Sequence, residues 1–115
     1  MRLALIPGQG GNADQWVAFP KAEQLEDAVF DLIVAGRVLP DGEVAIMMVE
    51  AEATEKSWNL IKGGAVKPSE EVVAEGLEAA KPFITQLVEA QNKVASTAAK
   101  EIQDYPVFPP YTSEV

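Results

Sequence analysis

Two apolar runs separated by a strong turn signal constrain this chain more than any other feature. The first run covers residues 28–35 and the second covers residues 44–49. Between them stands Pro40–Gly42, where proline presets φ and glycine supplies a left-handed backbone conformation. Both runs are rich in valine and isoleucine and are too short for a globular helix standing alone. We therefore predict a β-hairpin with one buried face, whose first strand closes at Ala35-Gly36.

A second hairpin is predicted upstream of the first. Residues 2–6 and 15–19 read as short strands, and residues 7–14 form a Gly-rich loop between them. This loop lacks the lysine and the Ser/Thr of a phosphate-binding loop, so we interpret it as a hairpin tip. Residues 24–26 can form a single helical turn. The strands are expected to be antiparallel within each pair.

Helices are predicted in the second half of the chain. Thr54 can cap a short helix that ends at Gly63-Gly64, and residues 65–68 form a linker. Ser69 caps the longest element, an apolar stripe with helical spacing that needs a sheet or other helices to pack on. Pro82 either kinks this helix or begins a second one. The fold class is therefore α+β.

The last segment, residues 104–115, has three of the eight prolines and several aromatic residues. Pro109-Pro110 forbids a helix, and we predict an extended Pro-rich tail that is either packed along a neighbouring surface or disordered.

Composition excludes several classes of function. The net charge of −9 and the nine Lys and Arg residues argue against nucleic-acid binding by this chain alone. It contains no histidine and no cysteine, which removes the commonest general base, thiolate chemistry and Cys-based metal sites. No apolar run approaches the roughly 20 residues of a membrane span. We expect a cytoplasmic protein without membrane contact.

Three acidic residues are the candidates for chemistry. Glu50 and Glu52 face the same side of a strand and could hold Mg²⁺ or Mn²⁺. Alternatively they face solvent or pair with Arg37 or Lys56. Asp31 interrupts an apolar run, so it either has a partner or faces outward, because burying an unpaired acid is costly.

The chain resembles polynucleotide phosphorylase along nearly all of its length. The motifs that carry the resemblance are VAGR at 34–37, AIMMVEAEATE at 45–55, RLALI at 2–6, QWVAFP at 15–20 and EEVVAEGLEAAKPFITQLVEAQ at 70–91. The match is closest to the actinobacterial form, which is also called guanosine pentaphosphate synthetase. That enzyme is several times longer, so these 115 residues look like an internal piece of it.

The resemblance implies a division of the chain. Residues 1–64 would be the C-terminal part of the first RNase PH-type domain, residues 65–103 an all-helical linker domain and residues 104–115 the extended tail. Residues 10–14 look inserted relative to the family, in a surface loop where insertions are tolerated.

The resemblance also implies an activity for the parent enzyme, namely phosphorolytic 3′-to-5′ RNA degradation by a homotrimer that uses Mg²⁺ or Mn²⁺. Its partners are RNA and inorganic phosphate, and its second RNase PH-type domain carries the active site. There the corresponding strand reads Asp-x-Asp-Phe-Lys-Val-Ala-Gly. Aligned on Val34–Gly36, Asp31 matches the second acid, whereas Val29 and Ile33 replace the first acid and the lysine. We therefore assign no catalytic, metal-binding or cofactor-binding residue in this chain. Asp31, Glu50 and Glu52 are kept only as weak candidates for metal ligands. The alternative is a stand-alone acidic protein-interaction module without enzymatic activity.

Overall fold

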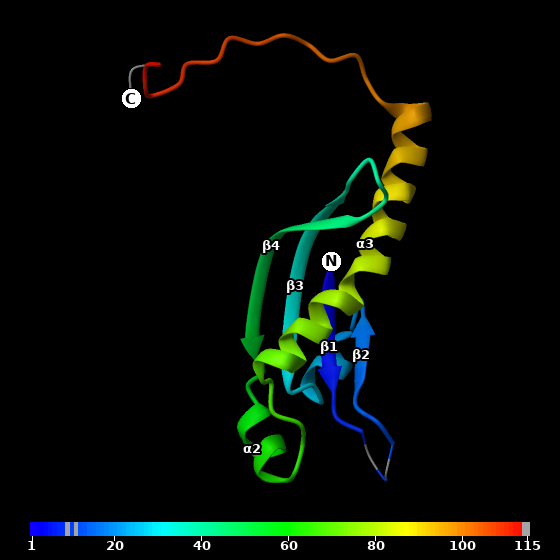
Figure 1. The fold of residues 1–115 in the computed structure, drawn as a ribbon, viewed down its shortest axis with the longest axis vertical. Helices are drawn as coiled ribbons and strands as arrows, with labels where there is room; N and C mark the ends of the chain where they lie inside the picture. The colour runs from blue at the N-terminus through cyan, green and yellow to red at the C-terminus, as the bar shows by residue number, and fades with distance from the viewer. Residues whose placement is uncertain (9, 11, 114–115) are drawn as a thin grey trace.

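The computed structural model describes residues 1–8, 10 and 12–113. It has a four-stranded antiparallel sheet with one long helix packed on one face (Figure 1). The elements follow the chain as β1 (Arg2–Ile6), β2 (Gln15–Ala18), α1 (Ala22–Glu26), β3 (Phe30–Val38), β4 (Val44–Ala53), α2 (Ser57–Lys62) and α3 (Glu70–Ala98). The order in the sheet is β2-β1-β3-β4, so β2 and β4 are the edge strands. The predicted α+β class and both hairpins are confirmed.

The central hairpin forms where the sequence predicts it, and Gly42 has the left-handed φ of 89° that the turn requires. The prediction that Ala35-Gly36 closes the first strand is wrong, because β3 continues to Val38. Ala35 pairs with Met48 and Gly36 pairs with Ile46, which leaves Met47 without a partner in the register. This β-bulge adds one residue to β4 and bends it.

Gly36 has a packing role in the middle of the strand. A Cβ atom at this position would lie 3.1 Å from Cδ1 of Ile84 in α3. The missing side chain therefore lets the helix approach the sheet closely, which explains a glycine that neither ends the strand nor makes a turn.

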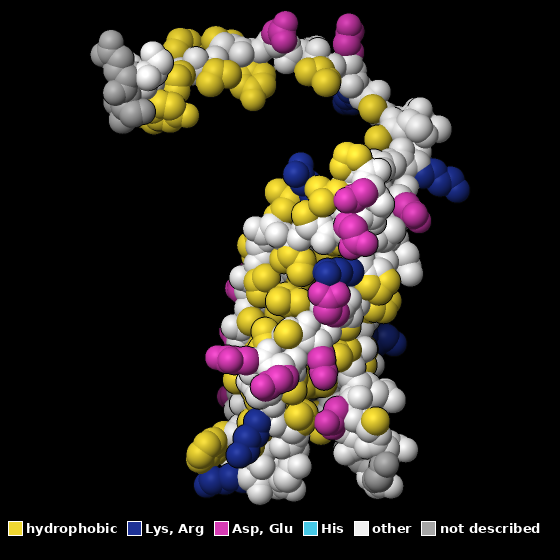
Figure 2. Space-filling view, in the orientation of Figure 1, with side chains coloured by type: hydrophobic (Ala, Val, Ile, Leu, Met, Phe, Trp, Pro, Cys, Tyr) yellow, Lys and Arg dark blue, Asp and Glu magenta, His cyan; other side chains and the backbone are white. Residues whose placement is uncertain are grey.

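The core lies between α3 and the sheet. Alternate residues of β1 and β3 point toward the helix, as the strand period of two requires. The buried core consists of Leu3, Leu5, Val29, Phe30, Leu32, Val34, Ala80 and Ile84. Trp16 extends it onto β2, since its ring meets Phe30 edge to face with 6.3 Å between the centroids. In Figure 2 apolar side chains gather beside α3 over the sheet.

A single helix runs from Glu70 to Ala98, with Pro82 inside it. The predicted cap is confirmed, because the Ser69 hydroxyl accepts a hydrogen bond from the Val72 amide at 3.4 Å. Because α3 continues through Pro82, the alternative of a second helix that starts at Pro82 is excluded. Both Pro82 and Glu78 are exposed, so water can satisfy the Glu78 carbonyl that the proline leaves without an amide donor.

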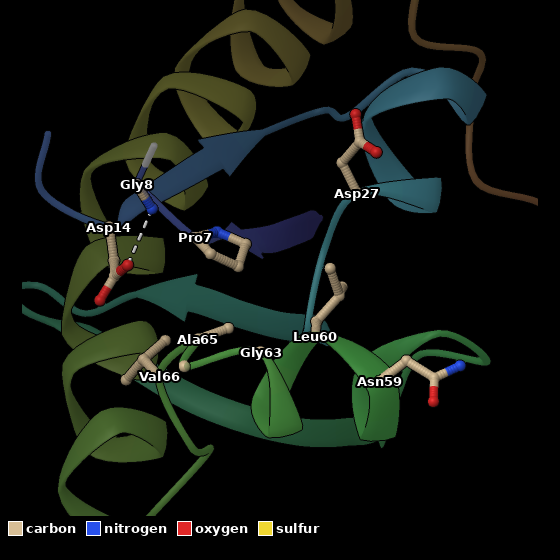
Figure 3. Close-up of a pocket in the computed structure, with 10 residues that line it drawn as sticks. Pro7, Gly8, Asp14, Asp27, Asn59, Leu60, Gly63, Ala65 and Val66 are labelled. Carbon is tan, nitrogen blue, oxygen red and sulfur yellow. Dashed lines mark hydrogen bonds between the residues drawn. The ribbon is translucent and has the colours of Figure 1, made fainter. Parts of the chain in front are cut away.

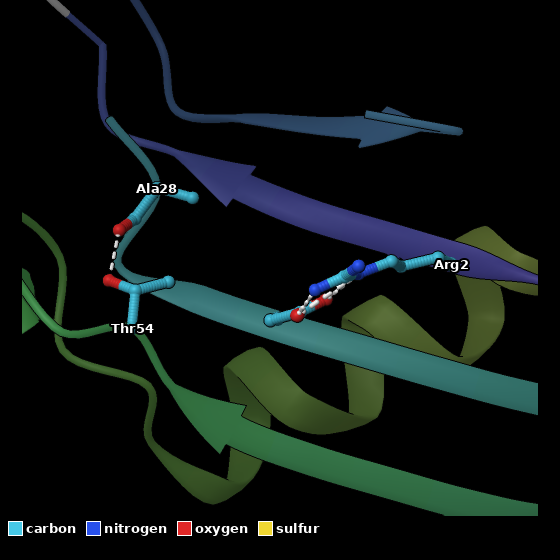
Figure 4. A network of polar contacts seen from close by, with 4 residues as sticks. Arg2, Ala28 and Thr54 are labelled. Carbon is cyan, nitrogen blue, oxygen red and sulfur yellow. Dashed lines mark hydrogen bonds and ion pairs between the residues drawn. The ribbon is translucent and has the colours of Figure 1, made fainter. Parts of the chain in front are cut away.

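Thr54 does not cap α2 as predicted, since the N-cap position belongs to Lys56. Instead the Thr54 hydroxyl donates a hydrogen bond to the Ala28 carbonyl and joins the end of β4 to the residues before β3 (Figure 4). The left-handed residue that follows α2 is Gly64, with a φ of 102°. The predicted glycine end of this helix is therefore confirmed.

Residues 99–113 leave α3 without forming a helix or strand, and their side chains are exposed. Among the described residues, no helix is both long and apolar enough to cross a membrane. Of the predicted insertion at 10–14, Gly11 lies outside the described residues, as does Gln9 just before it. The division at residues 64 and 103 stays a prediction, although Ala80 and Ile84 of α3 share one core with the sheet.

Candidate functional site

The three candidate carboxylates lie on the sheet face opposite α3. Glu52 of β4 pairs directly with Asp31 of β3, and Glu50 pairs with Ile33, which lies two residues after Asp31. Directly paired residues point to the same side of a sheet, and so do residues two apart along one strand. Leu32, between Asp31 and Ile33, points into the core on the other face. The register therefore brings all three acids onto one face of β3 and β4.

Arg2 on β1 is the cation that meets this group. Its Nε donates to Oδ1 and Oδ2 of Asp31 at 2.9 and 3.0 Å, and a terminal guanidinium nitrogen also bonds Oδ2 (Figure 4). The hydrogen bond to Asp31 raises the pKa of Arg2, and the charges of Asp31, Glu52 and Glu50 add to this effect. Asp31 is only 5% exposed, so the expectation that it has a partner is confirmed.

Of the alternatives expected from sequence for Glu50 and Glu52, exposure to solvent is confirmed and pairing with Lys56 is wrong. Lys56 bonds Glu26 at 3.0 Å, and this ion pair raises the pKa of Lys56. Arg37 is exposed on β3. Glu50 and Glu52 are themselves exposed, and their charges act on the guanidinium of Arg2.

This arrangement does not fit a divalent cation. The guanidinium already takes both oxygens of the Asp31 carboxylate, and a metal would have to displace it against charge repulsion. Within the part of the chain that the structure describes, His, Cys, Asp and Glu side chains form no group of three that could hold a metal ion. What these residues can do chemically is to cross-link β1 and β3 through a charged hydrogen-bonded pair.

Replacing Arg2 with methionine is expected to lower the free energy of unfolding by about 1–2 kcal/mol, because the buried Asp31 carboxylate loses its partner. The loss stays below that for a fully buried pair, since the Arg2 side chain is 45% exposed and partly solvated. Urea unfolding of the full chain measures it. Arg37→Met, at an exposed arginine of β3, is the control and should change the stability little. Equal losses in the two variants would contradict a specific role for the pair.

A cavity of about 510 Å³ lies at the end of the sheet, between the hairpin of β1 and β2 and helix α2 (Figure 3). Its lining residues are Pro7, Gly8, Asp14, Asp27, Asn59, Leu60, Gly63, Gly64, Ala65 and Val66. One carboxylate oxygen of Asp14 accepts a hydrogen bond from the Gly8 amide at 2.9 Å, which shapes the wall on the hairpin side.

The charge of this cavity decides which ligands it can take. Among the described residues that line it, Asp14 and Asp27 are charged, and none is a lysine or an arginine. Two carboxylates without a cation repel phosphate and the phosphodiester backbone of RNA. The cavity is therefore not a site for anionic substrates.

Comparison with known proteins shows that this α+β segment is similar to one part of much longer nucleotidyltransferases. It is 72% identical over 119 residues to the polyribonucleotide nucleotidyltransferase of Leifsonia xyli subsp. xyli, which covers 99% of this chain. The enzymes of Nocardia farcinica and Streptomyces griseus subsp. griseus are 62% and 60% identical over 118 and 114 residues, covering 100% and 99% of the chain. No protein-family profile matches it.

The chain spans 16% of the length of the Leifsonia enzyme and 15% of the other two. It belongs with one segment of the polyribonucleotide nucleotidyltransferases, and the resemblance expected from its motifs is confirmed. Sequence reasoning missed Arg2 as a member of the carboxylate group. The sequence signal for Arg2 was that it is the single cation of the first predicted strand. This signal identifies a partner for Asp31 only once β1 is known to lie beside β3.

Proposed function

We propose that this chain is a structural, non-catalytic segment of a phosphate-dependent polyribonucleotide nucleotidyltransferase that degrades RNA from the 3′ end. One observation carries the proposal. The identity of 56–72% extends over the whole chain, whereas the chain spans only 15–16% of the relatives. A segment of this size supplies part of a fold, and the remaining chain supplies the chemistry.

In the reaction an oxygen of inorganic phosphate attacks the phosphorus of the 3′-terminal linkage. The bond from that phosphorus to the 3′ oxygen of the preceding nucleotide breaks. That oxygen stays on the shortened RNA as its new 3′ hydroxyl after taking up a proton, and the terminal nucleotide is released as a nucleoside diphosphate. Such a displacement needs positive groups that neutralise charge on the phosphoryl oxygens. This chain has a net charge of −9, and its arginine on the acidic face is bound to Asp31. These properties suit a scaffold better than a phosphate site.

The parent enzyme proposed here has two RNase PH-type domains, with residues 1–64 in the first of them and residues 65–103 in or next to the helical region that follows. It is a cytoplasmic homotrimer, and Mg²⁺ or Mn²⁺ binds in the remaining chain. Guanosine pentaphosphate synthesis, the activity in the alternative name of the actinobacterial enzyme, would also reside there.

A phosphorolysis assay tests whether this segment is non-catalytic by itself. The purified chain is incubated with poly(A), inorganic phosphate and Mg²⁺, and we expect no ADP above the level without protein. The reason is the net charge of −9, which opposes the binding of phosphate and of RNA. The protein made at its natural length from the same gene serves as the positive control. Release of ADP by the 115-residue chain alone would overturn the non-catalytic assignment.

A stand-alone interaction module is the second candidate, and it is favoured by exposed apolar side chains such as Met47, which is 68% exposed. The native mass distinguishes the two. A blot of cell extract with an antibody against residues 69–100 should show a band several times larger than 12.3 kDa. A band at 12.3 kDa would favour the interaction module instead.

A further inference from the structure

Trp58 on α2 is exposed and has a lysine beside it. The residue is 66% exposed, and Nζ of Lys62 lies 4.9 Å from the centroid of its ring. The two residues are four apart in α2, so their side chains share one face of the helix. A tryptophan ring gains free energy from burial, and large exposed rings are typical anchors of binding surfaces. We call Trp58 and Lys62 the α2 patch.

The charge around the α2 patch is opposite in sign to that of the whole chain. Residues 56–69 contain three lysines and neither Asp nor Glu, whereas the chain has a net charge of −9. Lys56 is paired with Glu26. Within the described part of the chain, Lys62 and Lys67 belong to no ion pair. At the α2 end of Figure 2, Lys or Arg side chains accordingly lie beside apolar ones. The patch therefore favours an anionic ligand.

We propose that the α2 patch binds one unpaired base of single-stranded RNA and the phosphate next to it, away from the reaction centre of the longer enzyme. This inference rests on the proposed function, in which RNA is the substrate. Lys62 lies over one face of the ring, and the 66% exposure of Trp58 leaves the other face open. A base can stack on that open face. The flexible stem of Lys62 lets its ammonium group donate a hydrogen bond to a phosphate oxygen at the edge of the ring.

The acidity of the chain limits this contact but does not prevent it. At physiological salt, charges separated by more than about 8 Å are largely screened, so distant acids act weakly on a phosphate that touches Lys62. Over longer distances the net charge of −9 slows the approach of RNA. The patch is therefore expected to add a contact to RNA that the rest of the enzyme holds, and not to bind RNA in the isolated chain.

An acidic protein segment is the other class of ligand with a suitable charge. Its carboxylates would pair with Lys62, but they offer no flat apolar group to the open face of Trp58. A nucleotide supplies a flat ring and an anion close together, and the two members of the patch match these groups in kind. RNA therefore accounts for both residues, whereas an acidic segment accounts for one.

Photochemical crosslinking tests the proposal in the protein made at its natural length. The probe is a short radiolabelled oligouridine that contains 5-iodouridine, a photoreactive nucleotide that couples to aromatic side chains stacked on its base. Phosphate is omitted and EDTA is added, so that the RNA is not degraded. Trypsin cleaves after Lys56 and Lys62, which makes residues 57–62 the peptide that reports on Trp58. We expect this peptide to carry crosslinked RNA.

Lys62→Gln is expected to lower the crosslink yield at Trp58 by about threefold or more, because one phosphate contact is lost. The peptide of this variant extends to Lys67, so the yield is counted from the radiolabel. Lys62→Arg keeps the positive charge and should keep the yield. Lys93→Gln, at an exposed lysine of α3, removes the same charge elsewhere and is the matched control. Its yield should equal that of the unsubstituted protein.

Crosslinks on other peptides without one on residues 57–62 would overturn the proposal, while the phosphorolysis assay can still support the proposed function. Equal yields for Lys62→Gln and Lys93→Gln would also overturn it, because Lys62 would then hold no phosphate. Displacement of the RNA by poly(glutamate) at a lower charge concentration than unlabelled oligouridine requires would assign the patch to an acidic protein segment instead. A natural-length protein that neither crosslinks to RNA nor releases ADP would contradict both proposals.

Discussion

Leu32→Ala is expected to lower the free energy of unfolding by about 3 kcal/mol, within the range for removing a buried leucine side chain. Leu32 is fully buried in the centre of β3, where it lies between the neighbouring strands and under α3. The space left behind cannot collapse, because α3 and three strands hold its walls in place. Urea unfolding of the full chain, followed by far-UV circular dichroism, measures the loss.

Met47→Ala is the control for this prediction. Met47 is 68% exposed at the bulge of β4 and lacks a register partner, so its truncation should cost less than about 0.5 kcal/mol. A loss for Met47→Ala as large as that for Leu32→Ala would show that the chain in solution does not have the core described above.

Gly76→Val is expected to destabilise the chain by about 1–3 kcal/mol through overpacking. A Cβ atom at Gly76 would lie 2.6 Å from Cη2 of Trp16 and 3.0 Å from Cδ2 of Leu32. The tryptophan would have to move away from Phe30, and α3 would have to lift from the sheet. A gain in helix propensity of roughly 0.5 kcal/mol offsets only part of this cost.

Ala74→Val separates overpacking from helix propensity, since Ala74 is exposed on the same helix two residues earlier. Its expected cost is only the propensity difference of about 0.6 kcal/mol. Unfolding curves and near-UV circular dichroism, which reports the surroundings of the tryptophans, measure both variants. An unchanged near-UV spectrum and unchanged stability for Gly76→Val would mean that α3 does not pack on β2 as described.

The two faces of the sheet differ in their chemistry. One face of the sheet is partly covered by α3, and the other carries Asp31, Glu50 and Glu52 around Arg2. The first surface is suited to joining other apolar elements. On the second surface Arg2 binds the Asp31 carboxylate, whereas Glu50 and Glu52 are exposed to solvent. Both properties are consistent with the structural role proposed above.

Local patterns determined the secondary structure of this chain. The two runs rich in valine and isoleucine at 28–35 and 44–49, the Pro40–Gly42 turn and the Ser69 cap are local signals of backbone geometry and hydrogen bonding. They need no knowledge of the rest of the fold, so the hairpins and the start of α3 could be predicted. The motifs at 45–55 and 70–91 likewise sufficed to recognise the relatives.

Only the tertiary structure decided which distant residues meet. Arg2 reaches Asp31, 29 residues later, because β1 lies beside β3, and strand order is not written in any local pattern. Gly36 reads as a strand end in the sequence, but the approach of Ile84 makes it a packing position inside the strand. Val49 and Val34 look alike as strand valines, yet one is exposed and the other buried, because the width of one helix does not extend over all four strands.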